Sequence, residues 1–181
     1  MIVGLFGVSG VGKTTFNTKL SRKYPSITCY SASSLIKRCE GLIEYEKLNC
    51  EVVANNQLKL INAMNFISSN EQDVKIVIEL HNIIETESGI VFIERDVFSS
   101  LNLDFAFFIK KSASEIKKNR ELDTKKRRSA SLYELARIQN DALSYFFELY
   151  SDDKRLVITG VDDDLDLFKF IFDDKNRTSN N

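Results

Sequence analysis

A glycine-rich turn near the N-terminus constrains the fold of this chain more than any other feature. The apolar run Ile2–Phe6 leads directly into GVSGVGKT at residues 7–14, and Phe16, Leu20 and Tyr24 follow at helical spacing. The turn matches the pattern G-x-x-x-x-G-K-[ST], in which a strand passes through a loop into a helix. The N-terminal segment is therefore predicted to be a buried strand, a phosphate-binding loop (P-loop) and a helix.

The residue types of this loop suit a nucleoside triphosphate bound with Mg²⁺. Glycines let backbone N–H groups converge on phosphate oxygens, and the following helix adds the positive end of its dipole. Lys13 predicts a charge at the β- and γ-phosphates, and Thr14 predicts a hydroxyl ligand for Mg²⁺. We expect ATP–Mg²⁺ here, with GTP left open. The predicted contacts are Gly7, Val8, Ser9, Gly10, Val11, Gly12, Lys13, Thr14 and Thr15.

Composition places the chain among ordinary globular proteins. Its 181 residues are 43% hydrophobic and 28% charged, which predicts one domain with a sizeable core. The net charge of −1 provides no overall field for nucleic acid or a membrane surface. The N-terminal apolar run is short and leads into the P-loop, unlike a secretory signal. We expect a cytoplasmic protein without a membrane or nucleic-acid partner, and a homo-oligomer stays open.

Apolar runs alternate with helical patterns along the rest of the chain. This alternation is typical of a parallel sheet with helices on both faces. We predict a three-layer α/β P-loop NTPase fold with a five-stranded parallel sheet, as one domain over residues 1–172 followed by a flexible tail, 173–181. The predicted strands are Ile2–Phe6, Ile27–Tyr30, Val74–Leu80, Leu103–Ile109 and Leu156–Thr159, and the predicted helices are 12–24, 35–40, 55–68, one from Ser112, 131–150 and 163–172.

Two polar residues follow the third predicted strand. Glu79 ends an apolar run and should emerge beside the P-loop, where an acid in P-loop proteins holds Mg²⁺ directly or through water. A solvated acid at a strand end is the alternative. His81 is the only histidine, and the sequence leaves open whether it touches phosphate or substrate or supports other polar groups.

A basic stretch separates two predicted helices. Residues 119–129 contain five lysines and arginines, and capping boxes at Ser112–Glu115 and Ser131–Glu134 open the helices on either side. Phosphoryl transfer spreads negative charge, which a closing basic segment would neutralise while excluding water. A solvated turn is one alternative; a nucleic-acid patch is another, although aromatic residues that would stack bases are absent. We predict a basic helical lid over residues 119–130.

The chain resembles the archaeal-type adenylate kinases, a branch of the nucleoside monophosphate kinases. The resemblance rests on the order of four features: the P-loop, Glu79-Leu80-His81, Ser88-Gly89 and the basic stretch. The resemblance covers about residues 1–160. That family typically has Asp-Thr-His at the third strand and the lid pattern Arg-x-x-Asp-x-x-Arg-x-Arg. Here the corresponding lid positions hold Arg120, Asp123, Lys126 and Arg128.

The resemblance implies roles for these residues. Arg120, Lys126 and Arg128 would join Lys13 as catalytic contacts of ATP and the transferred group, and Thr14 and Glu79 would serve Mg²⁺. Residues 31–70 would form the acceptor region. The substrate contacts expected on this basis are Ser33, Arg38, His81, Ser88 and Gly89.

The chain also departs from the family pattern. Glutamate replaces aspartate at position 79, lysine at position 126 loses bidentate phosphate binding, and Asn49-Cys50-Glu51 is not basic where the family commonly is. ATP binding is thus better supported than adenylate specificity. We expect a phosphotransferase that moves the ATP γ-phosphoryl group to a small acceptor, with a nucleoside monophosphate as the first candidate. The alternatives are an ATPase or a nucleotide-dependent switch that has lost its acceptor site.

Overall fold

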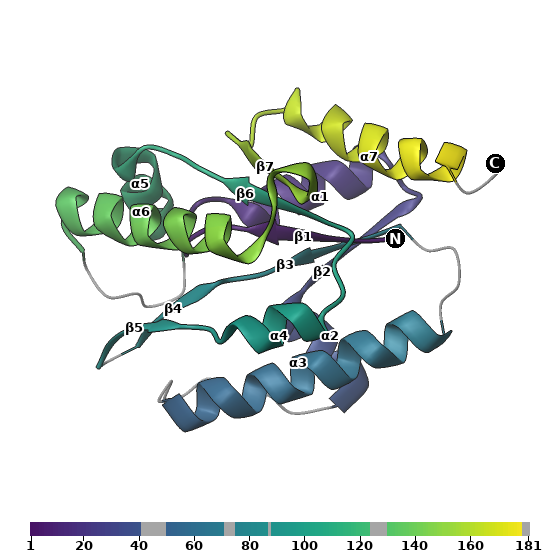
Figure 1. The fold of residues 1–181 in the computed structure, drawn as a ribbon. Helices are drawn as coiled ribbons and strands as arrows, with labels where there is room; N and C mark the ends of the chain where they lie inside the picture. The colour runs from purple at the N-terminus through teal and green to yellow at the C-terminus, as the bar shows by residue number, and fades with distance from the viewer. Residues whose placement is uncertain (41–49, 71–74, 87, 124–129, 179–181) are drawn as a thin grey trace.

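A five-stranded parallel sheet forms the centre of the molecule (Figure 1). In this computed structural model the described residues are 1–40, 50–70, 75–86, 88–123 and 130–178. The strand order is β2–β3–β1–β6–β7, so the N-terminal strand lies in the middle of the sheet. The predicted parallel sheet is confirmed. Its strands are β1 (Ile2–Phe6), β2 (Ile27–Ser31), β3 (Lys75–Glu79), β6 (Phe105–Ile109) and β7 (Arg155–Ile158).

Helices cover both faces of this sheet (Figure 1), which confirms the three-layer α/β P-loop fold. α1 packs against α7, α5 against α6, and α3 against both α2 and α4. The helices are α1 (Lys13–Lys23), α2 (Ala32–Glu40), α3 (Cys50–Asn70), α4 (Arg95–Ser100), α5 (Ala113–Leu122), α6 (Leu132–Leu149) and α7 (Asp164–Thr178), with a short 3-10 turn at Asp152–Lys154.

Two adjacent phenylalanines of β6 explain why helices are held on both faces. Successive side chains of a strand point to opposite faces. Phe107 stacks on Phe168 of α7, with ring centroids 4.0 Å apart, while Phe108 contacts Phe146 of α6 at 5.3 Å. All four rings are fully buried. An uninterrupted apolar strand therefore requires a helical layer above and below it.

An antiparallel hairpin and a short helix after β3 were not predicted from the sequence. β4 (Ile83–Thr86) pairs with β5 (Gly89–Phe92), apart from the central sheet, and α4 follows. Gly89 has a φ of +133°, a conformation that few other residues adopt, at the start of the returning strand. Two short apolar runs flank Ser88-Gly89, and this sequence pattern is typical of a hairpin.

The ends of two helices also differ from the prediction. α3 begins at Cys50 instead of near residue 55. α7 continues to Thr178, beyond the predicted end at Phe172, and residues 179–181 lie outside the described residues. The flexibility expected of the tail stays a prediction. Among the described helices, none has the length and hydropathy of a membrane span.

Candidate active site

The P-loop lies at the carboxyl end of β1, where parallel strands commonly place ligand sites. Its backbone depends on glycines with positive φ, among them Gly10 at +84° and Gly12 at +102°. Gly12 is the N-cap of α1. The loop therefore combines free backbone geometry with the positive end of a helix dipole, which together suit an anion.

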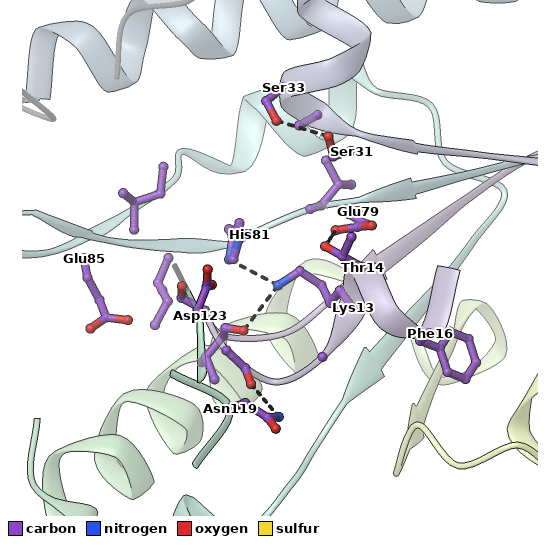
Figure 2. A pocket seen from close by; sticks show the side chains of 18 of the residues that line it. Lys13, Thr14, Phe16, Ser31, Ser33, Glu79, His81, Glu85, Asn119 and Asp123 are labelled. Atoms are coloured by element: carbon purple, nitrogen blue, oxygen red, sulfur yellow. Dashed lines mark hydrogen bonds between the residues drawn. The ribbon is translucent and has the colours of Figure 1, made fainter. Parts of the chain in front are cut away.

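Lys13 lies across this loop and is almost buried, with 6% of its surface exposed. Its Nζ donates to the carbonyl of Gly7 at 2.6 Å and to that of Val8 at 3.3 Å. The same atom lies 3.4 Å from Nδ1 of His81, which follows β3 (Figure 2). The ammonium group is thus held between the loop and His81, facing the cleft.

Glu79 is held beside the P-loop by the register of the sheet and by two hydrogen bonds. Leu5 of β1 is in register with Glu79 of β3. Thr14 donates its hydroxyl to one carboxylate oxygen at 2.9 Å (Figure 2), and Asn17 donates its amide to the other at 3.2 Å. The Thr14 hydroxyl and the Glu79 carboxylate are hard oxygen groups of the kind that Mg²⁺ prefers.

This donor set fits Mg²⁺ shared with a phosphate chain. The described residues contain no group of three or more His, Cys, Asp or Glu side chains arranged as a self-sufficient metal site. Mg²⁺ usually takes only one or two protein ligands, together with water and substrate phosphates. Cys29 on β2 supplies no thiolate at neutral pH, because burial, assisted by the nearby Glu79 carboxylate, raises the pKa of its thiol to about 12.

A cleft of about 1360 Å³ joins the P-loop to a second, mostly uncharged wall. That wall comes from the start of α2, from α3, from the segment after β3 and from α4. Its apolar lining residues are Ile36, Val53, Leu60, Leu80, Ile83, Ile84 and Phe98, and its uncharged polar ones are Ser31, Ser33, Asn56, Gln57 and Thr86. The cations among the described lining residues are Lys13, Lys19, Lys111 and Arg120, all on the nucleotide side.

The end of α5 contacts the P-loop through two side chains. Asn119 donates its amide to the carbonyl of Gly10 at 2.9 Å, and Arg120 donates Nε to the carbonyl of Ser9 at 3.0 Å. The predicted capping boxes that open the two helices flanking the basic stretch are confirmed at Ser112 for α5 and Ser131 for α6. The hydrogen bond from the Ser112 hydroxyl, with one from its backbone, lowers the pKa of Glu115.

The family model described as "AAA domain" matches residues 6–136, which is most of the chain. The chain belongs to this AAA domain family. None of the curated proteins matches it in sequence.

Several solved structures share the fold of this AAA domain. The tunicamycin resistance protein of Deinococcus radiodurans has a TM-score of 0.60 at 12% identity, covering 92% of this chain and 92% of its own. Shikimate kinase from Acinetobacter baumannii, in complex with shikimate, has a TM-score of 0.56 at 15% identity, covering 99% and 93%. Deoxyadenosine kinase from M. mycoides has a TM-score of 0.52 at 11% identity, covering 98% and 100%.

These comparisons support the resemblance only at the level of the P-loop kinase-like fold. They show a P-loop domain with the fold of small kinases, and they do not single out the archaeal-type adenylate kinases. The acceptor is not determined by them.

Several residues predicted for the site do line the cleft of this AAA domain. They belong to the P-loop, the end of β3, the start of α2 and the end of α5: Val8, Ser9, Gly10, Gly12, Lys13, Thr14, Thr15, Ser33, Glu79, His81 and Arg120. Lys126 and Arg128 lie outside the described residues, as does the rest of 124–129, which is half of the predicted lid.

Three of the predicted substrate contacts are not among the lining residues. The Arg38 guanidinium donates to the Tyr30 hydroxyl and lies over its ring, 5.5 Å from the centroid. Ser88 lies at the β4–β5 turn, with its hydroxyl 3.0 Å from that of Thr86, and Gly89 begins β5. Their roles in substrate binding stay predictions.

Several polar groups of the cleft were not predicted from the sequence. Asn56 and Gln57 interrupt the apolar pattern of α3, and such an interruption in the sequence indicates a polar site on a buried face. Glu85 and Asn119 gave no such signal, because each acquires its place only through a partner distant in the chain.

Proposed function

We propose that this AAA domain is an ATP–Mg²⁺-dependent phosphotransferase that acts on a small acceptor. The supporting observation is that one continuous cleft contains both the P-loop and the second wall. It places Lys13 and the Thr14–Glu79 pair beside an apolar wall that carries a few polar groups. A mostly apolar cavity with a few convergent polar groups is the usual form of a small-molecule site. An ATPase without an acceptor would not need this second wall.

In the proposed reaction each residue of the P-loop side has a defined task. The loop N–H groups and the helix dipole bind the phosphates, and Lys13 stabilises the negative charge of the moving group. Glu79 orients the Thr14 hydroxyl through their hydrogen bond. Mg²⁺, when bound, neutralises charge on the β- and γ-phosphates. No covalent intermediate is needed, because positioning and charge stabilisation are sufficient for phosphoryl transfer.

A nucleoside monophosphate is the acceptor that the adenylate kinase resemblance suggests. Its phosphate would need a basic partner, and the basic residues of the acceptor region that the resemblance implies are Lys37, Arg38, Lys47 and Lys59. Solved kinases of this fold are named for acceptors as different as shikimate and deoxyadenosine, so the fold accommodates varied chemistry.

An uncharged hydroxyl-bearing acceptor is the second candidate. It is favoured by the wall formed by α2, α3 and β4, whose described lining residues include amides and hydroxyls but no lysine or arginine. Gln57 and Ser33 could hydrogen-bond such a molecule while apolar side chains bury its body.

A coupled assay of ADP formation tests both candidates. Purified protein with ATP–Mg²⁺ would be offered matched pairs, each a nucleoside and its monophosphate, with Lys13→Ala as the control. ADP formed only with the monophosphate of a pair would identify a nucleoside monophosphate kinase, and ADP formed only with the nucleoside would identify the second candidate. ADP formed without an acceptor would indicate an ATPase. Bound ATP without turnover would favour a nucleotide-dependent switch.

A further inference from the structure

Two carbonyl groups of the P-loop accept hydrogen bonds from side chains at the end of α5. Arg120 binds the carbonyl of Ser9, and Asn119 binds that of Gly10. In a planar trans peptide the C=O and the following N–H point in opposite directions. These two hydrogen bonds therefore direct the N–H groups of Gly10 and Val11 away from α5. The Val11 N–H donates within the loop to the carbonyl of Val8, at 3.3 Å. Backbone N–H groups of this loop are the ones that cradle phosphates.

Arg120 is in turn held by Glu85. The guanidinium donates to both oxygens of the Glu85 carboxylate, at 3.0 and 2.5 Å, in a bidentate pair. The Arg120 side chain is only 7% exposed and that of Glu85 22%. A charge this well buried requires a partner, and the bidentate geometry fixes the plane of the guanidinium as well as its position.

The close approach of Arg120 to the loop depends on glycine. A Cβ at Gly10 would lie 2.6 Å from Cγ of Arg120, which is closer than such atoms can come. The arginine stem thus rests directly on the backbone of Gly10 while its Nε reaches the Ser9 carbonyl. The Nε–H is engaged with the loop, and Nη1 and Nη2 with the carboxylate, so the side chain has one defined arrangement.

Glu85 comes from a different part of the fold than the groups it holds. It lies on β4, in the hairpin that stands apart from the central sheet, and its neighbours Ile84 and Thr86 line the acceptor wall. It therefore links this wall, through Arg120, to the backbone of the P-loop.

We propose that Glu85 is a positioning residue for nucleotide binding. It fixes Arg120, which together with Asn119 holds the P-loop carbonyls so that the loop N–H groups are preorganised for phosphate. The inference rests on the proposed function, because it assumes that ATP binds at this loop. In the competing arrangement, Glu85 keeps Arg120 away from the nucleotide. Loss of the Glu85 charge would then strengthen nucleotide binding instead of weakening it.

Titration calorimetry with AMP-PNP and Mg²⁺ distinguishes these arrangements. Glu85→Gln should weaken binding about tenfold, because a neutral amide cannot replace the charged bidentate partner. Glu85→Asp, which keeps the charge, should lose less. Glu94→Gln makes the same change of charge at an exposed site and should bind as the parent does. Circular dichroism verifies that each variant is folded, and Arg120→Lys, which cannot pair in the bidentate manner, is a second test.

A double-mutant cycle shows whether Glu85 acts through Arg120. In an Arg120→Gln background, Glu85→Gln should cause no further loss of affinity. The ³¹P resonance of the β-phosphate of bound ADP should shift in Glu85→Gln, since that phosphate reports the loop N–H groups, whereas a purely structural role would leave it in place.

Three results would overturn the inference. They are unchanged or tighter AMP-PNP binding by Glu85→Gln, an equal loss with and without Arg120, and an unshifted β-phosphate resonance. A parent protein that binds no AMP-PNP would overturn the proposed function and this inference with it. Normal binding by the parent combined with normal binding by Glu85→Gln would overturn the inference alone.

Discussion

The two sides of the cleft are assembled in different ways. On the nucleotide side, the loop, Lys13 and Thr14 are neighbours in the chain, and Lys13 contacts the carbonyl of Gly7 within the same loop. Their distant partners, Glu79 on β3 and the end of α5, hold a loop whose backbone shape the motif already requires. On the acceptor side, Ser33, Gln57 and Ile83 come from three separate elements that only the fold brings together. The backbone of the nucleotide side is therefore specified by local sequence, and the acceptor side by packing.

The difference has a consequence for specificity. A phosphate chain is bound mainly by backbone N–H groups, whose positions depend on a short run of φ and ψ angles. An acceptor is recognised by side chains, whose identity can change without altering the fold. Variants on the nucleotide side should therefore impair every reaction of the protein, whereas variants on the acceptor side should affect one substrate.

The largest expected effect is that of Lys13→Ala. Loss of the ammonium should lower phosphoryl transfer about 10²- to 10³-fold, as the removal of a donor to transition-state charge commonly does. Lys154→Ala, at an exposed lysine of the 3-10 turn, is the matched control. Turnover measured with the coupled assay checks it. Equal rates in Lys13→Ala and the parent would break the assignment of the nucleotide side.

Glu79→Gln should have the next largest effect, on the same side. The amide can still accept from Thr14 but lacks the negative charge that favours a divalent cation. We expect the Mg²⁺ concentration for half-maximal activity to rise about 10- to 100-fold, with nucleotide binding in the absence of Mg²⁺ little changed. A Mg²⁺ titration at saturating ATP measures this. An unaltered midpoint would show that Glu79 does not contribute to Mg²⁺ binding.

On the acceptor side, Gln57→Leu sharpens the comparison. Gln57 is half-buried and lines the cleft, so its loss should raise KM for the acceptor about tenfold while the Kd for AMP-PNP stays the same. Asn62→Leu, at an exposed position of the same helix, is the control. Weaker AMP-PNP binding in Gln57→Leu would show that the two sides are not separable in this way.

The smallest expected effect concerns the capping box that opens α5. Ser112→Ala should cost about 1 kcal/mol of unfolding free energy. Part of this depends on pH, because the hydrogen bond from Ser112 lowers the pKa of Glu115 from its ordinary value of 4.5. A carboxyl whose pKa is lowered on folding stabilises the fold above the unfolded pKa.

The difference between the parent and Ser112→Ala should therefore be complete at neutral pH. It should shrink as the pH falls below 4.5 through the lower folded value. Thermal unfolding measured across this range checks the sign, and a gap that widens in acid would contradict the capping role.

Local sequence determined the backbone of the nucleotide side because its geometry is short-range. Gly10 and Gly12 adopt positive φ values that the motif requires, and the capping boxes at Ser112 and Ser131 form between residues three apart. The alternation of apolar strands and helices likewise predicted the parallel sheet, since each strand of such a sheet is buried on both faces.

Tertiary structure alone decided which distant side chains meet. Glu85 and Arg120 are 35 residues apart, and no spacing rule connects a strand of a hairpin to the end of a later helix. Arg38, for which substrate binding stays a prediction, lies against Tyr30, because a long flexible side chain takes the partner that packing places nearest. Periodicity along a chain reports which residues are buried, but the choice of partner depends on how the elements pack in three dimensions.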